Sequence, residues 1–225
     1  MTDIITLYGH LTVDKIIVDF QEQVSLGGIA NVWHGIKYLN KNVSVNLVPT
    51  NIGEAVVLVD KDSNQRIGRG CLNLSSSKVK HKKSDWHHIA YLNQVTHTNF
   101  IKEISQGIIS ADITKEYPEK AIPLLSHIDY LFISEDDLFM DLKELGNLTK
   151  GWVIMHSPKR SICTDGNQEL SYEIPKNLML NGVNVLGAGD YFASAFITQT
   201  IKGLELKDAI THAHKNTTEI LKNQT

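Results

Sequence analysis

Short apolar runs alternate with longer segments of helical periodicity along most of the chain. Buried parallel strands read as continuous apolar runs, whereas helices repeat their apolar positions every three or four residues. The runs predict strands at 4–8, 13–20, around 24, 43–48, 55–60, 67–74, 88–92, 107–111, 130–134 and 151–156. This order is typical of β-α-β units around a largely parallel sheet, so an α/β fold is expected.

The periodic segments predict helices between and after these strands. The first opens after Gly27 and Gly28 and runs to about Asn40, with an apolar face made of Ala30, Trp33, Ile36 and Leu39. Further helices are expected at 99–105, 118–127, 136–145, 188–201 and 205–222. The loop at 75–83 is the best internal break, but no second domain or repeat follows it, so a single domain over 1–225 is expected.

The composition fits an ordinary globular protein, with 42% hydrophobic and 21% charged residues. A net charge of −3 offers no basic field, so no nucleic-acid partner is expected. The one dense basic run, residues 78–83, is either a solvated loop or an anion contact. The N-terminus lacks the features of a secretory signal, and no apolar run is long enough to span a membrane. With Cys71 and Cys163 as its only cysteines, the protein is expected to be cytoplasmic and without membrane contact.

The most informative segment is 184–197, where a loop of small residues leads directly into a predicted helix. Gly187, Ala188 and Gly189 are small enough to let backbone N–H groups converge on an anion at the positive end of the helix dipole. A carboxylate beside that anion has little use in binding, but Asp190 is suited to take a proton from a hydroxyl that attacks a phosphoryl group. The segment therefore indicates phosphoryl transfer, with Asp190 as base and the 187–189 amides stabilising the developing charge.

Two other interpretations of this segment remain open from the residues alone. A glycine turn followed by an acidic first-turn residue is a common way to begin a helix. A dinucleotide-binding glycine motif would need a small residue at Phe192, and it normally follows the first strand of a domain instead of lying near the end of the chain.

The segment 184–197 resembles the C-terminal signature of the pfkB, or ribokinase-like, carbohydrate kinases, including the small pair Ser194-Ala195. Two earlier segments, 9–14 and 26–31, are similar to the family's first strand and to its N-terminal glycine motif. The resemblance implies a ribokinase-like three-layer α/β/α fold with a mostly parallel central sheet. It also implies a small β lid, formed by about 12–26 and with 53–74 as a second candidate segment, together with ATP as donor and Mg²⁺ as cofactor.

The resemblance also implies roles for individual positions. A sugar-like substrate would be bound by Asp14, Gly27, Gly28 and Asn31. The nucleotide would be bound by Asp112, Ser134, His156 and Asn184, and the metal ion by Asp137. From the residues alone, Asp14 can equally be a loop residue after a strand, and the glycine pair can be only a turn.

The sequence departs from the family pattern mainly at the nucleotide positions. The signature opens with Asn184-Val185 where the family has Asp-Thr, and residues 134–137 read Ser-Glu-Asp-Asp where the family has Asn-x-x-Glu. Pro158 occupies a position where glycine is usual, and proline has no N–H to donate.

The first functional hypothesis is ATP-dependent phosphorylation of a hydroxyl on a sugar or sugar-like small molecule. The alternative is a catalytically impaired relative that binds a sugar or a nucleotide as a sensor or partner subunit, and a purely structural protein is a third class. A homodimer through the lid is also open, since Ile16, Val18 and Phe20 alternate along an exposed segment, although these residues are equally suited to a core.

Overall fold

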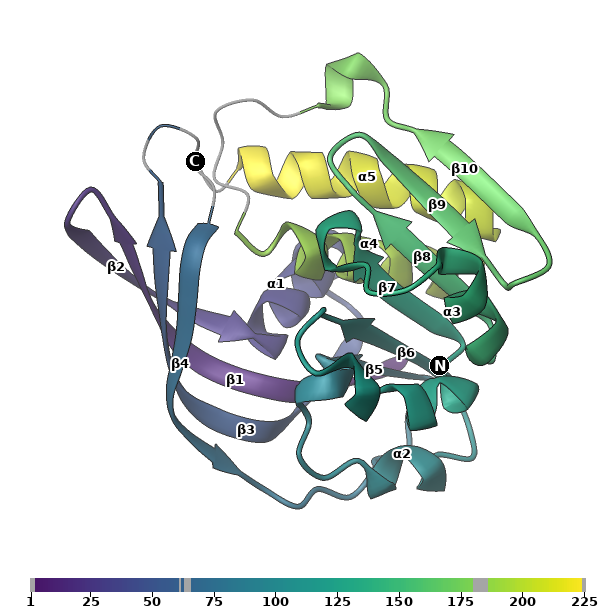
Figure 1. The fold of residues 1–225 in the computed structure, drawn as a ribbon, viewed down its shortest axis with the longest axis horizontal. Helices are drawn as coiled ribbons and strands as arrows, with labels where there is room; N and C mark the ends of the chain where they lie inside the picture. The colour runs from purple at the N-terminus through teal and green to yellow at the C-terminus, as the bar shows by residue number, and fades with distance from the viewer. Residues whose placement is uncertain (1–2, 61, 63–65, 180–185, 224–225) are drawn as a thin grey trace.

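The computed structural model describes residues 3–60, 62, 66–179 and 186–223, and within these ranges ten strands form one sheet (Figure 1). In spatial order they are β10 (Glu169–Glu173), β9 (Arg160–Thr164), β8 (Trp152–His156), β7 (Tyr130–Ser134), β6 (Ile108–Ile113), β5 (Trp86–Ala90), β1 (Ile4–Val18), β3 (Ser44–Val59) and β4 (Arg66–Ser76), while β2 (Gln21–Gly28) pairs with β1. Neighbouring strands from β8 to β3 are parallel. The other four strands are added antiparallel.

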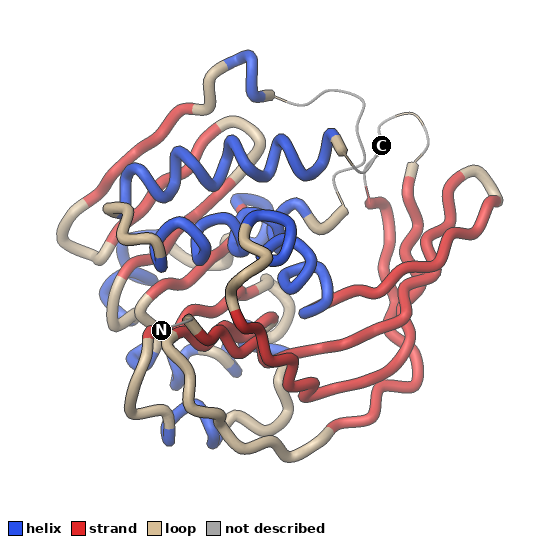
Figure 2. Tube along the Cα trace, turned by 180° about the vertical axis from the view of Figure 1, so that it is seen from behind, coloured by secondary structure: helices blue, strands red, loops and turns tan. Residues whose placement is uncertain are grey.

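Helices cover both faces of this sheet and make three layers (Figures 1 and 2). One face carries α1 (Ile29–Leu39), α4 (Ala188–Ile201) and α5 (Leu206–Lys222). The other carries α2 (Asn99–Glu103), α3 (Leu142–Leu148) and 3-10 turns at Pro118–Lys120 and Ile122–His127. Shorter 3-10 turns lie at Leu92–Gln94, Glu135–Asp137 and Lys176–Leu178. The expected α/β fold with a mostly parallel sheet is confirmed.

Each face of the sheet has its own buried core. Phe196 of α4 packs edge-on against Phe132 of β7, with ring centroids 5.3 Å apart. On the opposite face, Leu125 and Leu145 are fully buried among side chains of β6, β7 and β8. Within the described ranges, none of the helices combines the length and the apolar character that a membrane crossing needs.

β1 and β3 continue past the body of the sheet, where β2 and β4 pair with their outer halves. We call this four-stranded extension, residues 11–28, 51–59 and 66–76, the lid; it projects from the helical layers in Figure 2. The predicted breaks within these strands were wrong, because each is a single strand that runs from the body into the lid. Gly9, with φ +151°, and the bulge that follows it bend β1 without ending it.

Segments 118–127 and 136–145 also differ from the helices predicted there. The first forms 3-10 turns, because Pro123 lies inside the expected helix and lacks the N–H group that an α-helix interior uses. In the second, the α-helix starts later than expected, where the Asp141 carboxylate caps its first turn. β9 and β10 were not predicted, since their residues mix polar and apolar positions without a continuous run.

The buried face of α1 is rotated slightly from the predicted one. Ala30 and Ile36 are buried as expected, but Trp33 is 39% exposed and Val32 is fully buried. Trp33 instead borders the large cavity of the molecule. An apolar residue on a helix can therefore face a ligand-sized space and not the core.

Candidate active site

α4 begins with a glycine that its surroundings require. Gly187 caps the helix with φ +76°, a left-handed conformation that glycine adopts without strain. A Cβ at this position would lie 3.2 Å from the Tyr191 ring and 3.4 Å from the Asn31 side-chain amide. Ala188 and Gly189 follow, so little side-chain bulk covers the helix N-terminus where it borders the cavity.

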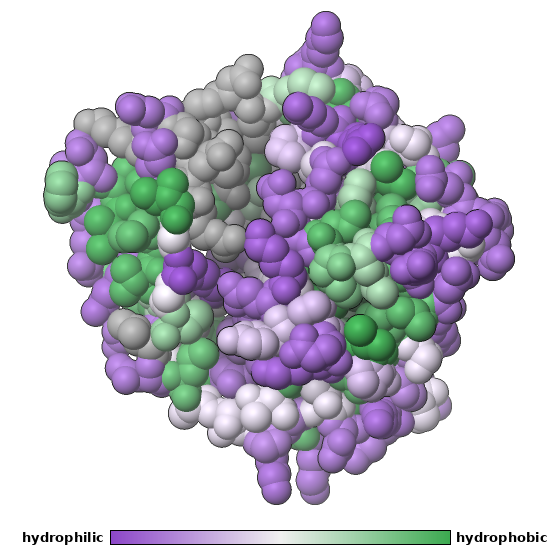
Figure 3. Space-filling model, in the orientation of Figure 1, coloured by the Kyte–Doolittle hydropathy of each residue, from purple (hydrophilic) through white to green (hydrophobic). Residues whose placement is uncertain are grey.

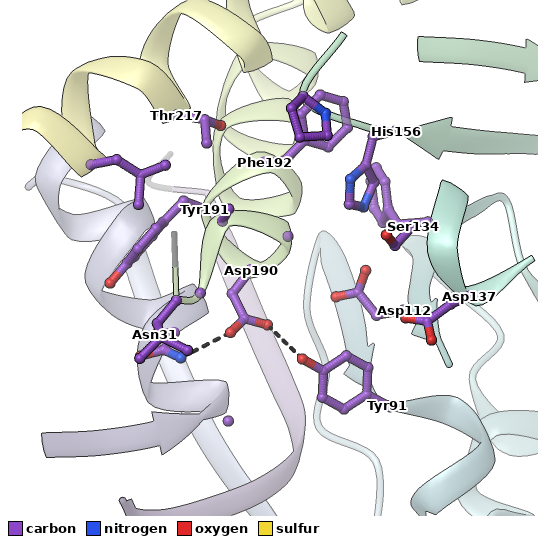
Figure 4. Close-up of a pocket in the computed structure, with 18 of the residues that line it drawn as sticks. Asn31, Tyr91, Asp112, Ser134, Asp137, His156, Asp190, Tyr191, Phe192 and Thr217 are labelled. Atoms are coloured by element: carbon purple, nitrogen blue, oxygen red, sulfur yellow. Dashed lines mark hydrogen bonds between the residues drawn. The ribbon is translucent and has the colours of Figure 1, made fainter. Parts of the chain in front are cut away.

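Asp190, in the first turn of α4, is only 5% exposed. Its carboxylate accepts hydrogen bonds from the Asn31 amide at 2.9 Å and from the Tyr91 hydroxyl at 3.3 Å (Figure 4). Burial, and then the charge of Asp112, raise the pKa of Asp190 to about 6, and the hydrogen bond from Asn31 opposes the rise. The group is therefore mostly ionised at neutral pH and can accept a proton there.

The cavity in front of Asp190 has a volume of about 1220 Å³, and it is lined by residues of the lid and by residues at the carboxyl ends of the central strands. Open parallel sheets bind ligands at this edge. Four consecutive strands each bring a polar side chain to it: Tyr91 directly after β5, Asp112 on β6, Ser134 at the end of β7 and His156 at the end of β8.

The cavity has two ends of different composition. The lid end is lined by residues of β1, β2, α1 and β4: Asp14, Gly28, Asn31 and Arg69. The strand end is lined by residues that follow or end the central strands: Asp112, Ser134, Asp137 and His156. Asp190 and the mouth of α4 lie between them (Figure 4).

At the lid end, the two glycines make room for the groups around them. A Cβ on Gly27 would lie 2.1 Å from the carboxylate of Asp14, which accepts a hydrogen bond from the Thr12 hydroxyl at 2.5 Å. Gly28 has φ +64°, and a Cβ there would lie 2.1 Å from the carbonyl oxygen of His10. Both glycines are therefore dictated by close approach, and they hold Asp14 beside the start of α1.

At the strand end, the polar groups are buried with fewer partners. The Asp112 carboxylate lies 3.2 Å from the His88 imidazole, yet neither facing atom has a hydrogen bond of good geometry. His156 stacks on Phe192 with ring centroids 4.8 Å apart, and burial lowers the pKa of His156. Pro158 lies in the tight turn between β8 and β9, closed by the Ser157 N–H donating to the Arg160 carbonyl at 2.9 Å.

Carboxylates at the strand end are suited to a hydrated divalent cation. Mg²⁺ commonly takes one or two protein carboxylates and completes its shell with water and phosphate oxygens. Asp112 offers a buried oxygen that has no hydrogen-bond partner, and Asp137 also lines the cavity, whereas Glu135 is paired with Arg160 at 2.6 Å. In the described part of the chain, no three acidic, histidine or cysteine side chains converge as a complete metal site.

Three residues of the site have no place in the sequence predictions. Tyr91 donates to Asp190, His88 adjoins Asp112, and Arg69 lines the lid end. Tyr91 could have been found, because it is a polar residue near the carboxyl end of the strand predicted at 88–92. Arg69 carries no such signal, since a cation on a lid strand normally faces solvent.

Comparison with known proteins finds similarity in structure but not in sequence. No protein-family model matches the chain, and no curated protein matches it. Solved structures do match along nearly the whole length. Adenosine kinase from Sinorhizobium meliloti superposes with a TM-score of 0.78 at 13% identity, over 98% of this chain and 94% of that one.

The chain has the ribokinase-like fold. A ribokinase from Thermotoga maritima matches with a TM-score of 0.74 at 16% identity, over 96% of this chain and 92% of that one. A pyrophosphate-dependent kinase in the ribokinase family also matches at 0.74 and 13% identity, over 97% and 95% of the two chains. The ribokinase-like architecture expected from residues 184–197 is thus confirmed, including the small β lid.

The ribokinase-like fold brings the predicted site residues to one place. Those that line the cavity are Asp14, Gly28, Asn31, Asp112, Ser134, Asp137, His156, Gly187, Ala188, Gly189 and Asp190. Gly27 contacts the carboxylate of Asp14 from the side, and Asn184 lies outside the described residues. The roles of these residues stay predictions, because the matching structures share too little sequence to transfer them.

Proposed function

We propose that this protein is a kinase that transfers the terminal phosphoryl group of ATP to a hydroxyl of a sugar or sugar-like small molecule. The observation that carries the proposal is the Asp190 carboxylate, buried in the cavity beside the open N-terminus of α4. The three solved structures reported above, which share this fold, are kinases, and this supports the same reaction class.

In the proposed reaction, Asp190 accepts the proton of the attacking hydroxyl. Its pKa of about 6 leaves it ionised at pH 7, and the donors from Asn31 and Tyr91 hold the carboxylate in one orientation. The backbone amides at 187–189 and the helix dipole stabilise the negative charge of the transferred phosphoryl group. Asp14, Gly28 and Asn31 bind the acceptor, so that catalysis rests on positioning and electrostatics.

The strand end would hold the donor. Asp112 and Asp137 would bind Mg²⁺, which neutralises charge between the donor phosphates when bound. His156 and Ser134 would contact the nucleotide, and the apolar side chains of Ile174, Leu178 and Leu221 also line the cavity. Pro158 contributes no N–H in this region, so the donor would rely on side chains and on the amides of α4.

A binding protein without turnover is the second candidate. The specific observation in its favour is the strand end, where Pro158 closes a tight turn and the facing atoms of Asp112 and His88 lack hydrogen bonds. Calorimetry with ATP, with and without Mg²⁺, separates the two candidates. Mg-ATP binding without consumption across a broad acceptor panel would favour the binding protein.

We also propose that two copies associate through the outer face of the lid. The strand register places Val24 and Leu58 on the face opposite Asp14, and these side chains are 63% and 42% exposed. Figure 3 shows hydrophobic side chains gathered over the lid. Ile16 does not belong to this face, because it lines the cavity. Light scattering should give a dimer for the native chain and a monomer for Val24→Asp.

The proposed function is tested by a nucleotide-consumption screen over sugars, sugar derivatives and nucleosides. The Asp190→Asn protein is the control, since it keeps the volume of the side chain but cannot accept the proton. Consumption that needs an acceptor and is absent in the variant supports the kinase. Equal activity of the two proteins would remove Asp190 from the mechanism.

A further inference from the structure

Arg69 enters the cavity from the lid. The register pairs Arg69 of β4 with Val57 of β3, and Val57 with Ile16 of β1. All three line the cavity, as does Asp14 two residues before Ile16, so they share the inner face of the lid. The Arg69 side chain therefore lies on the same face of the lid as Asp14, which is proposed to bind the acceptor.

The donors of Arg69 are unused. No hydrogen bond or ion pair joins Arg69 to any residue in the described ranges, and its Nε is shielded from solvent. The nearby carboxylates take their hydrogen bonds elsewhere: Asp14 from Thr12, and Asp190 from Asn31 and Tyr91. A buried donor without a partner is costly, so the arrangement is incomplete without a ligand.

We propose that the acceptor carries an oxyanion, a carboxylate or a phosphate monoester, and that Arg69 binds it. This inference rests on the proposed kinase function and narrows its substrate class to acidic sugars. The planar guanidinium matches both oxyanions with two parallel hydrogen bonds, which a lone hydroxyl cannot form. Asp14, Asp112 and Asp190 would repel an anionic acceptor, and Arg69 is the group on the inner face of the lid that offsets this repulsion.

Acceptor binding without donor provides the test. Calorimetry would compare three matched ligands on a pentose and on a hexose: the neutral sugar, its terminal phosphate and its aldonic acid. The native protein should bind one of the anionic forms at least about tenfold more tightly than the neutral sugar. Arg69→Met should weaken that ligand by about 10- to 100-fold, the loss of a charge-assisted pair, and change neutral binding by less than about threefold.

Two further variants secure the interpretation. Arg69→Lys keeps the positive charge but lacks the planar guanidinium that donates two parallel hydrogen bonds. It should therefore recover part of the affinity that Arg69→Met loses. Lys15→Met removes a charge from the outer face of the same lid, where Lys15 pairs with Glu54 at 3.3 Å, and should leave anion binding unchanged. Thermal unfolding of each variant checks that the lid is intact.

Each outcome decides the inference. The anionic ligand that loses affinity in Arg69→Met identifies carboxylate or phosphate as the recognised group. Equal binding of neutral and anionic sugars, equal losses for both in Arg69→Met, or no Arg69-dependent binding of any anionic ligand overturns it. Arg69-dependent binding without transfer from ATP would retain the anion site and reject the kinase, whereas transfer to neutral acceptors alone would do the reverse.

Discussion

At the lid end of the cavity, the carboxylate of Asp14 accepts a hydrogen bond from Thr12, and the amide of Asn31 donates one to Asp190 between the two ends. At the strand end, by contrast, Asp112 and His88 lie 3.2 Å apart without a hydrogen bond. The lid end is also the more constrained, since its two glycines leave no room for a Cβ. The difference indicates that the lid end is preorganised in the absence of a ligand, except for Arg69, whose hydrogen-bond donors have no partner among the described residues. At the strand end, polar groups without partners in the described part of the protein are available to bind a charged ligand, such as a phosphoryl donor with its cation.

Among the variants that test this difference between the two ends, Gly28→Ala should have the largest effect. The new Cβ would lie 2.1 Å from a backbone oxygen at a residue with φ +64°, so unfolding should become easier by about 3 kcal/mol or more. Gly70→Ala is the matched control within the lid, where a Cβ meets nothing within 4 Å. Denaturant unfolding that shows similar losses for both variants would contradict a preformed lid end.

Asp190→Asn should make the protein more stable above pH 6. The folded protein raises the pKa of Asp190 from 3.8 to about 6, so ionising the buried group costs stability as the pH rises through this window. Removing the charge should recover about 1–3 kcal/mol at pH 8, and the difference should vanish below pH 4. Urea unfolding at pH 4 and pH 8 measures it, and equal stability of the two proteins at pH 8 would refute the buried charge.

Asp112→Asn tests how the strand end acts on the lid end. The charge of Asp112 contributes to the raised pKa of Asp190, so its removal should move the acid limb of the activity profile to lower pH. The midpoint of the acid limb is the quantity to compare between the native protein and the variant. Asp14→Asn is the comparison on the other side of Asp190. An unmoved or raised midpoint in Asp112→Asn would mean that the two ends are electrostatically independent.

Tyr91→Phe should have the smallest effect. It removes one donor at 3.3 Å and leaves the Asn31 hydrogen bond to Asp190 in place. A loss of about 3- to 10-fold in kcat is expected, with little change in unfolding free energy. Steady-state kinetics of Tyr91→Phe beside Asn31→Ala would rank the two donors, and a larger loss for Tyr91→Phe would reverse the expected order.

The sequence predicted many residues of the site but not the contacts between them. The motif at 184–197 predicted α4 with its bounds and placed Asp190 in its first turn, because loop, helix and carboxylate are local in sequence. The pairing of Asp112 with His88 depends on the register of β5 against β6, which no local pattern encodes. Arg69 was missed for the same reason, since only the register of the lid directs it into the cavity.

The fold shows the same division between local and long-range information. Strands β7 and β8 were predicted within a residue of their bounds, because each is a continuous apolar run between turns. β1 and β3 were divided in error, because glycine and polar residues normally end a strand. Here pairing on both sides of β1 carries the strand through Gly9, and this pairing is visible only in three dimensions.

The rate of phosphoryl transfer in a single turnover, followed against pH, tests the central claim most directly. If Asp190 accepts the hydroxyl proton, the native rate should fall about tenfold per pH unit below pH 6, where the carboxylate becomes protonated. The Asp190→Asn rate should be at least about 10³-fold lower and independent of pH in this range. A variant that keeps more than about a tenth of the native rate, or a native rate that does not change below pH 6, would contradict the account.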